Sequence, residues 1–186
     1  MKAIKKLTAA IITLSIALSL VPTFTLTATA AGFTGASGGD GTAESPYEIG
    51  TLAQLEAFRN YINDGNTGEG EYFKLTADID MSVRYHGGNG GELWTPIGNF
   101  SKQFKGTLDG GDHKISKLYI NTTASYKGLF GYIGKGGKIQ NLGVADGFVA
   151  GDRFIGGIAG ESYGTIENSY YTGAVVGKAY IGGIAG

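Results

Sequence analysis

The distribution of apolar residues divides the chain into an export signal and a mature part. Residues 7–21 (LTAAIITLSIALSLV) contain no charged side chain and follow a lysine-rich start. Ala28 and Ala30 then place small residues where signal peptidase requires them. This order predicts a cleavable signal peptide over residues 1–30. A retained membrane anchor is the alternative interpretation, although the apolar run is shorter than the roughly 18–20 residues that span a bilayer.

A helical pattern of apolar residues occurs once, in residues 51–63 (TLAQLEAFRNYIN). Thr51 and Gln54 have the spacing of a capping box, which predicts that the helix begins there. Spacings of three and four residues put one set of side chains on the same face: Leu52, Leu55, Phe58 and Ile62. Glu56 falls on the opposite, solvent-facing side. We therefore expect an amphipathic helix that covers the N-terminal end of a core.

Beyond the helix the apolar pattern has the period of β-strands. In residues 72–79 (YFKLTADI) the positions 73, 75, 77 and 79 are apolar, as in a strand with one buried face. Short strand signals then recur at residues 104–108, 114–120, 138–144 and 148–150. Glycine accounts for 34 of the 186 residues, which favours many tight turns between these short strands.

Internal repeats dominate the second half of the chain. A four-residue element occurs in three copies, spaced 29 and then 26 residues: Gly128, Leu129, Phe130 and Gly131; Gly157, Ile158, Ala159 and Gly160; Gly183, Ile184, Ala185 and Gly186. The step IQN, ending at Asn141, recurs as IEN, ending at Asn168. These asparagines should form a stacked amide ladder or occupy left-handed corners. Landmarks that repeat in a fixed order indicate units that stack on one another.

A repeat of this length with about three short strands predicts an all-β fold, a right-handed parallel β-helix or β-solenoid in which each unit makes one turn. Leu129, Ile158 and Ile184 should then form one inward ladder, with about 4.8 Å between neighbouring strands. The longer first unit has two extra residues within 132–137 and one at 145–146. We expect these extra residues to bulge outward, because a slip within a strand would turn its apolar side chains to solvent.

The glycine element, with the following IQN or IEN step, resembles the GLUG repeat of bacterial surface and secreted proteins. The segments GTAESPYEIGTLAQLEAFRNYIN, WTPIG and FKGTLDGGDHKISKLYI are similar to the region that precedes such repeats, so the resemblance covers residues 41–186. It implies a role at the cell surface, as in adhesins and in the non-catalytic part of immunoglobulin A-cleaving metallopeptidases. The motif is more specific for the type of repeat than for a function.

Charge and composition exclude several classes of partner. Loss of residues 1–30 removes three of the 15 basic residues and none of the 16 acidic ones, which leaves a net charge of −4. This pattern lacks the basic patch that binds phosphates, so no nucleic-acid partner is expected. There is no cysteine, so the exported chain must be stable without disulfides. We expect no cofactor and no transmembrane span in the mature chain.

Two carboxylate groupings are candidates for metal binding or acid–base chemistry. Asp78 and Asp80 are two residues apart, so on a strand they share a face and can chelate a cation. Asp109 and Asp112 flank a Gly-Gly pair, which is typical of a turn closed by an aspartate side chain. A structural role is the competing interpretation of both. The sequence contains no HExxH motif, so no catalytic residue is assigned and the chain is not expected to be an enzyme.

Tyrosines of the repeats are the candidate ligand contacts. They are Tyr163, Tyr170, Tyr171 and Tyr180, and they can stack within the solenoid or on a sugar ring or protein partner. Alternation places one of Tyr170 and Tyr171 outside. We expect a secreted or cell-surface protein of the adhesin or stalk type, whose partner is a protein or glycan of a host or neighbouring cell. The alternative function is a carbohydrate-active β-helix enzyme, a polysaccharide lyase or glycosidase.

The predicted organisation has four parts. Residues 1–30 are the signal peptide, and residues 31–47 are a flexible lead or a turn-rich first strand. Residues 48–127 are the N-terminal cap with the first β coils, and residues 128–186 are the GLUG-like repeats. Because the last repeat stops at an apolar strand edge without a capping segment, we expect the natural protein to continue beyond Gly186.

Overall fold

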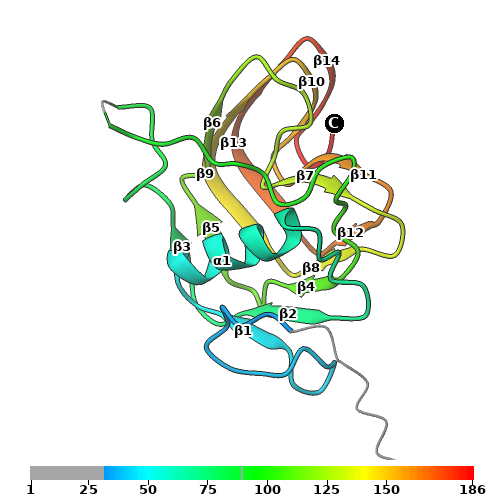
Figure 1. Ribbon diagram of the computed structural model, residues 1–186. Coiled ribbons are helices and arrows are strands. Elements are labelled where there is room, and N and C mark those ends of the chain that lie inside the picture. The colour runs from blue at the N-terminus through cyan, green and yellow to red at the C-terminus, as the bar shows by residue number, and fades with distance from the viewer. Residues whose placement is uncertain (1–31, 89) are drawn as a thin grey trace, which may run out of the picture. The chain divides into compact units, whose positions relative to one another are not determined.

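The chain winds into a β-solenoid of about five turns (Figure 1). The computed structural model describes residues 32–88 and 90–186, so the predicted signal peptide lies outside the described residues. Every pair of described strands is parallel. With one helix among the described residues, the fold confirms the predicted class, an all-β parallel β-helix.

Four sheets run along the solenoid, and neighbouring strands in each sheet come from successive turns. The first sheet contains, in order, β1 (Tyr47–Ile49), β2 (Tyr72–Leu75), β4 (Thr107–Asp109), β8 (Lys138–Gln140) and β12 (Thr165–Glu167). The second contains β13 (Tyr170–Val176), β9 (Gly143–Ala150), β5 (Lys114–Ser116) and β3 (Ile79–Asp80), and β6 (Tyr119–Asn121) also pairs with β9. The remaining two sheets pair β10 (Arg153–Gly156) with β14 (Ala179–Gly182), and β7 (Phe130–Ile133) with β11 (Ala159–Ser162).

The core is a row of apolar side chains along the solenoid axis. Tyr47, Phe73, Leu108, Ile139 and Ile166 are successive partners across the first sheet. Phe73, Leu108 and Ile139 are at most 1% exposed, because alternate residues of a strand point to the same face. Full burial of such a side chain contributes about 1.5–3 kcal/mol. One turn alone could not bury this face, so the turns stabilise one another.

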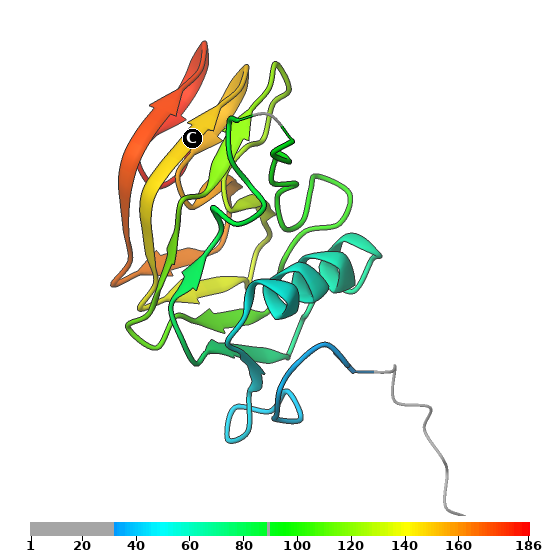
Figure 2. The ribbon, with the colours of Figure 1, turned by 90° about the vertical axis from the view of Figure 1, so that its left-hand side faces the viewer.

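The helix α1 (Leu52–Asn63) lies at the N-terminal end of the stacked turns (Figure 2). Leu55, Phe58 and Ile62 are fully buried. The Phe58 ring centroid lies 4.5 Å from that of Phe73 on β2. The predicted amphipathic face is confirmed, and it packs on the first turns of the core.

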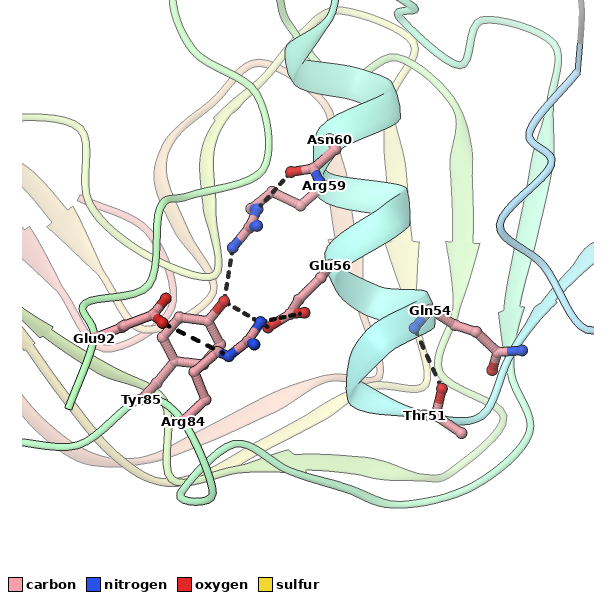
Figure 3. Close-up of polar contacts among 8 residues, drawn as sticks. All are labelled: Thr51, Gln54, Glu56, Arg59, Asn60, Arg84, Tyr85 and Glu92. Atoms are coloured by element: carbon pink, nitrogen blue, oxygen red, sulfur yellow. Dashed lines mark hydrogen bonds and ion pairs between the residues drawn. The ribbon is translucent and has the colours of Figure 1, made fainter. Parts of the chain in front are cut away.

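The start of α1 uses the predicted residues in a modified form of the capping box. Thr51 Oγ1 accepts a hydrogen bond from Gln54 N at 3.3 Å (Figure 3). The Gln54 side chain bonds one residue further back than the standard motif, since its Oε1 accepts from Gly50 N at 2.8 Å. Two backbone donors at the helix start are therefore satisfied.

Glu56 is not the freely solvated residue that helical periodicity predicts. Its Oε1 accepts a hydrogen bond from Tyr85 Oη at 2.7 Å, and its Oε2 lies 2.8 Å from Arg84 Nη1 (Figure 3). Arg59 Nη1 donates to the same Tyr85 hydroxyl at 2.9 Å, and its guanidinium stands 4.7 Å from the centre of the Trp94 ring. These contacts hold the solvent-facing side of α1 against the loop that follows β3.

The predicted ladder of the glycine elements is confirmed. Phe130 pairs with Ala159 in β7 and β11, and Ala159 pairs in turn with Ala185. The preceding residues Leu129 and Ile158 are fully buried, and Ile184, in the last turn, packs against the core while remaining partly exposed. The three copies therefore occupy equivalent places in successive turns.

An earlier copy of this element was missed because it has no leading glycine. Ile97, in the segment WTPIG, pairs with Phe130, and Ile97 N donates to Leu129 O at 3.0 Å. The buried Trp94 adds a side-chain bond, since its Nε1 donates to the same carbonyl at 3.0 Å. Ile97 is equivalent to Phe130 in its backbone pairing and not in its sequence, so only the folded chain shows this copy.

The three extra residues of the longer repeat lie where predicted. Four residues, 134–137, join β7 to β8, whereas two residues, 163–164, make the same connection between β11 and β12. Within β9, Ala145 and Asp146 together face Thr172 of β13, and the register on both sides is kept. Asp146 is exposed and has a positive φ of 52°, as a bulged residue often does.

Both predicted roles of the repeated asparagines are confirmed. Asn141 and Asn168 have positive φ angles of 52° and 47°, a conformation that asparagine tolerates better than most residues. Asn168 Nδ2 donates to Asn141 Oδ1 at 3.4 Å, and Asn141 Nδ2 donates to Asp109 Oδ1 at 3.1 Å. A polar ladder thus runs along one corner of the solenoid.

The segment before β1 contributes Phe33 to the core, and Ala36 packs against the core while partly buried. Phe33 is 5% exposed, and its ring centroid lies 5.7 Å from that of Tyr47 and 6.2 Å from that of Phe58. Interpretation of residues 31–47 as a flexible lead did not foresee this burial. An isolated phenylalanine among small polar residues carries no periodicity from which it could be inferred.

Candidate functional site

A column of stacked aromatic rings runs along another corner of the solenoid. Tyr126, Phe154 and Tyr180 occupy equivalent positions in three successive turns, and we call them the aromatic ladder. The ring centroids are 4.8 Å apart for Tyr126 and Phe154 and 4.7 Å apart for Phe154 and Tyr180, with interplanar angles of 3° and 6°. These distances equal the spacing of neighbouring strands, because each ring repeats the position of the one before it.

All three residues of the aromatic ladder have a backbone conformation that is unusual for aromatic residues. Their φ angles are 58° for Tyr126, 57° for Phe154 and 54° for Tyr180. A bulky side chain at positive φ costs about 1–3 kcal/mol, and such strain gathers at functional sites. Ring stacking offsets part of it, at about 0.5–1.5 kcal/mol for each pair. The solenoid therefore maintains a strained corner through three turns.

A second aromatic stack lies beside the ladder. The Tyr132 and Tyr163 rings are nearly parallel, at 16°, with centroids 5.7 Å apart. Tyr132 also lies 6.3 Å from Tyr126 and makes an edge contact with Phe100 at 5.8 Å. Tyr163 and Phe100 keep 64% and 66% of their surface exposed. Together the two stacks form one aromatic surface from several turns.

The structure separates the four predicted tyrosines into two groups. Tyr163 and Tyr180, the latter 63% exposed, belong to the aromatic surface. Tyr170 and Tyr171 lie instead on β13, where alternation works as predicted. Tyr170 is 50% exposed, whereas Tyr171 packs against the core, and burial raises the pKa of its hydroxyl to about 12.

Sequence reasoning named two of the six residues of the aromatic surface, Tyr163 and Tyr180, because it considered only the tyrosines between residues 163 and 180. Each residue of the aromatic ladder stands two positions before a glycine, in the segments YKG, FIG and YIG. This aromatic-x-Gly signal ends at the first glycine of the first element and stands immediately before the other two, and it would have found Tyr126 and Phe154. Phe100 and Tyr132 have no comparable signal, because they join the surface through tertiary contacts.

Asp78 and Asp80 each bind backbone rather than one another. Asp78 Oδ1 accepts from Lys114 N at 3.1 Å and lies 3.2 Å from His113 Nδ1, and the first of these bonds is the main cause of the lowered Asp78 pKa. Asp80 Oδ1 accepts from Ser82 N at 2.8 Å, which lowers the Asp80 pKa. Within residues 32–88 and 90–186, no three His, Asp or Glu side chains gather as metal ligands would.

A cavity of about 540 Å³ lies on the outer face of the first sheet. Its charged lining residues are Glu44, Lys74, Asp109 and Lys138. Asp109 closes the predicted turn, since its Oδ1 accepts from Gly111 N at 2.8 Å. Burial acts to raise the Asp109 pKa, but the hydrogen bonds from Gly111, Gln140 and Asn141 outweigh it and lower the pKa. Lys138 Nζ lies 2.6 Å from Glu167 Oε1.

Comparison with known proteins shows similar sequences within much longer proteins. No family model matches this sequence. A "Putative Gly-rich membrane protein" of Evansella cellulosilytica is 38% identical over 136 residues, which cover 71% of this chain and 15% of that protein. Halomucin of Haloquadratum walsbyi is 39% identical over 153 residues, covering 80% of this chain and 2% of halomucin. The chain therefore spans a small part of the length of these relatives.

The fold has a counterpart among solved structures. The crystal structure of a putative immunoglobulin A1 protease from Bacteroides ovatus superposes with a TM-score of 0.52 at 22% identity. The match covers 82% of this chain and 64% of the other. At this identity the likeness shows a shared fold. Separately, no helix of the described residues is long and apolar enough to cross a membrane.

Proposed function

We propose that this chain is a GLUG-type repeat module, exported and exposed at the cell surface, that binds a glycan or protein through its aromatic surface and has no catalytic role. The observation that carries the proposal is the aromatic ladder, in which three successive turns keep a strained aromatic residue at one corner. Exposed aromatic rings with polar tips are the side chains that most often dominate binding energy. The name of the Evansella relative, which includes the word membrane, supports the location.

The carbohydrate-active enzyme is the competing function, and the 540 Å³ cavity on the first sheet is the observation in its favour. Asp109 is its best acid–base candidate, yet three hydrogen-bond donors hold this carboxylate in its ionised form. Such a group suits a structural corner better than proton transfer near neutral pH. Incubation with a panel of polysaccharides separates the two functions. Products that disappear in the Asp109→Asn variant would establish the enzyme.

Binding through the aromatic surface is tested by matched tyrosine substitutions. Tyr180→Ala and Tyr163→Ala should each weaken binding to a glycan array or to whole cells by about tenfold, because each removes a stacked, exposed ring. Tyr170→Ala is the control, since Tyr170 is also half-exposed but lies on β13 outside the aromatic surface. Equal binding by all three variants and the unchanged protein would refute this function.

A further inference from the structure

A cavity of about 260 Å³ lies at the first ring of the aromatic ladder. Tyr126, Phe100 and Lys127 line it, together with Asn63 from the end of α1. A second cavity, of about 130 Å³, shares Lys127 with the first. Both are smaller than the 300 Å³ or more that a drug-sized ligand fills. The larger one suits a single ring-sized group at the end of the column of rings.

Lys127 gives this place its charge. Among the described residues that line the two cavities, Lys127 is the one whose side chain is charged at neutral pH. No ion pair or side-chain hydrogen bond engages its amine within residues 32–88 and 90–186. The residue is partly buried, and burial lowers its pKa. An anion that enters the cavity would relieve the cost of this unpaired, desolvated charge.

The aromatic residues add a second requirement for the ligand. Tyr126 stacks on Phe154 in the ladder, and Phe100 is 66% exposed. Aromatic rings of this kind pack on flat groups with apolar faces. A simple inorganic anion would satisfy Lys127 but would leave these rings without a contact. A ring-shaped ligand that carries one negative charge satisfies both.

We propose that this cavity binds one carboxylate-bearing sugar residue of a glycan. The sugar ring packs against Tyr126 and Phe100, and its carboxylate accepts a charge-assisted hydrogen bond from Lys127 Nζ. The inference rests on the proposed function and names the class of ligand. It also predicts how the glycan is oriented on the aromatic surface, since the acidic sugar lies at Tyr126, the N-terminal end of the ladder.

The test compares two sugars that differ at C6 of each unit, which is a carboxylate in one and a neutral hydroxymethyl group in the other. Isothermal titration calorimetry of the whole chain is carried out with a tetrasaccharide of (1→4)-linked glucuronic acid and with the corresponding glucose tetrasaccharide. We expect the acidic sugar to bind at least tenfold more tightly, because one charge-assisted contact is worth about that factor. Lys127→Gln should remove this difference, and the difference should shrink as salt rises.

Lys135→Gln is the matched control, because Lys135 is an exposed cation that lines neither cavity. Thermal unfolding of both variants verifies that they fold. If the unchanged protein binds both sugars equally, or if Lys127→Gln binds like the unchanged protein, the acidic-sugar inference is wrong. If Tyr180→Ala still weakens the binding of both sugars in that case, the proposed function stands. Binding of neither sugar, with no loss in the tyrosine variants on cells, overturns both.

Discussion

Residues with positive φ angles recur at equivalent corners of successive turns in this solenoid. Asn141 and Asn168 occupy one such corner, and their amides bond along the axis. Tyr126, Phe154 and Tyr180 occupy another, where asparagine would be the less strained choice. Stacking of the three rings offsets part of the free-energy cost of that strain. The same backbone solution therefore yields a polar ladder at one corner and an aromatic one at the other.

Asp109 lies at the first position of the polar ladder, and its charge should make stability depend on pH. Because its folded pKa is lowered, the native state favours the carboxylate. The stabilisation is present above the unfolded pKa of about 3.9 and is lost as the pH falls through the folded pKa. Asp109→Ala should lower the free energy of unfolding by about 2 kcal/mol at pH 7, and by much less at pH 2.5. Urea denaturation at both pH values measures this.

Glu44→Ala is the control for this prediction, since Glu44 lines the same cavity and is exposed. It should change the free energy of unfolding by less than about 0.5 kcal/mol at either pH. If Asp109→Ala lowers the free energy of unfolding as much at pH 2.5 as at pH 7, the side chain acts through packing and its charge contributes nothing.

At the scale of elements, α1 is held by contacts on both of its sides. Its apolar face covers the first turns, with Leu55, Phe58 and Ile62 fully buried. Its other side is held by the contacts of Glu56 with Arg84 and Tyr85. A helix of 12 residues is marginal by itself in water. Tertiary contacts on both sides therefore stabilise it.

A charge placed on the buried face of α1 should unfold the N-terminal turns. Leu55→Asp buries an unpaired carboxylate at a position with no exposure, which should cost about 4 kcal/mol. Ala53→Asp adds the same charge at an exposed position in the first turn, where it should be neutral or slightly stabilising. Glu56→Ala should cost about 1–2 kcal/mol, since it leaves Tyr85 without its acceptor. Thermal denaturation followed by circular dichroism ranks the three; equal shifts for Leu55→Asp and Ala53→Asp would contradict the packing.

At the scale of the whole molecule, the solenoid tolerates repeats of unequal length because two extra residues are placed in a corner connection and one in a bulge of β9. Residues 134–137 make a connection that takes two residues in the following turn. In the preceding turn the same connection also takes two residues, 105–106. They lie between Phe104, which pairs with Ile133, and Thr107, which pairs with Lys138. The strands on both sides keep their register, so the core row is uninterrupted.

Deleting Lys135 and Gly136 together should therefore preserve the fold. Both residues are exposed, and their removal gives three successive turns the same connection length. We expect the free energy of unfolding to change by about 1 kcal/mol or less. Deletion of Val149 alone is the contrasting variant, because a one-residue slip within β9 turns its apolar set toward solvent. A folded, equally stable Val149 deletion would contradict the register argument.

Patterns that depend on local spacing were sufficient for much of this fold. Residues 51–63 predicted α1 because helical period and capping act within one turn. The glycine elements predicted the alignment of Leu129 with Ile158, because a solenoid repeats its sequence with its geometry. Trp94 and Ile97 escaped this reasoning, since their turn matches the later ones in backbone pairing and not in sequence letters. Phe33 escaped it because one apolar residue has no period.

The candidate site divides along the same line. The sequence by itself determined that the chain forms stacked parallel turns, which asparagines line a corner, and that Tyr163 and Tyr180 lie in the repeats. Only the tertiary structure decided that Phe100 and Tyr132 lie beside the aromatic ladder, and that Lys127 lines two cavities in which no acidic side chain faces it. The reason is physical: periodicity fixes what neighbouring residues share, whereas a binding surface is set by where distant turns place their side chains.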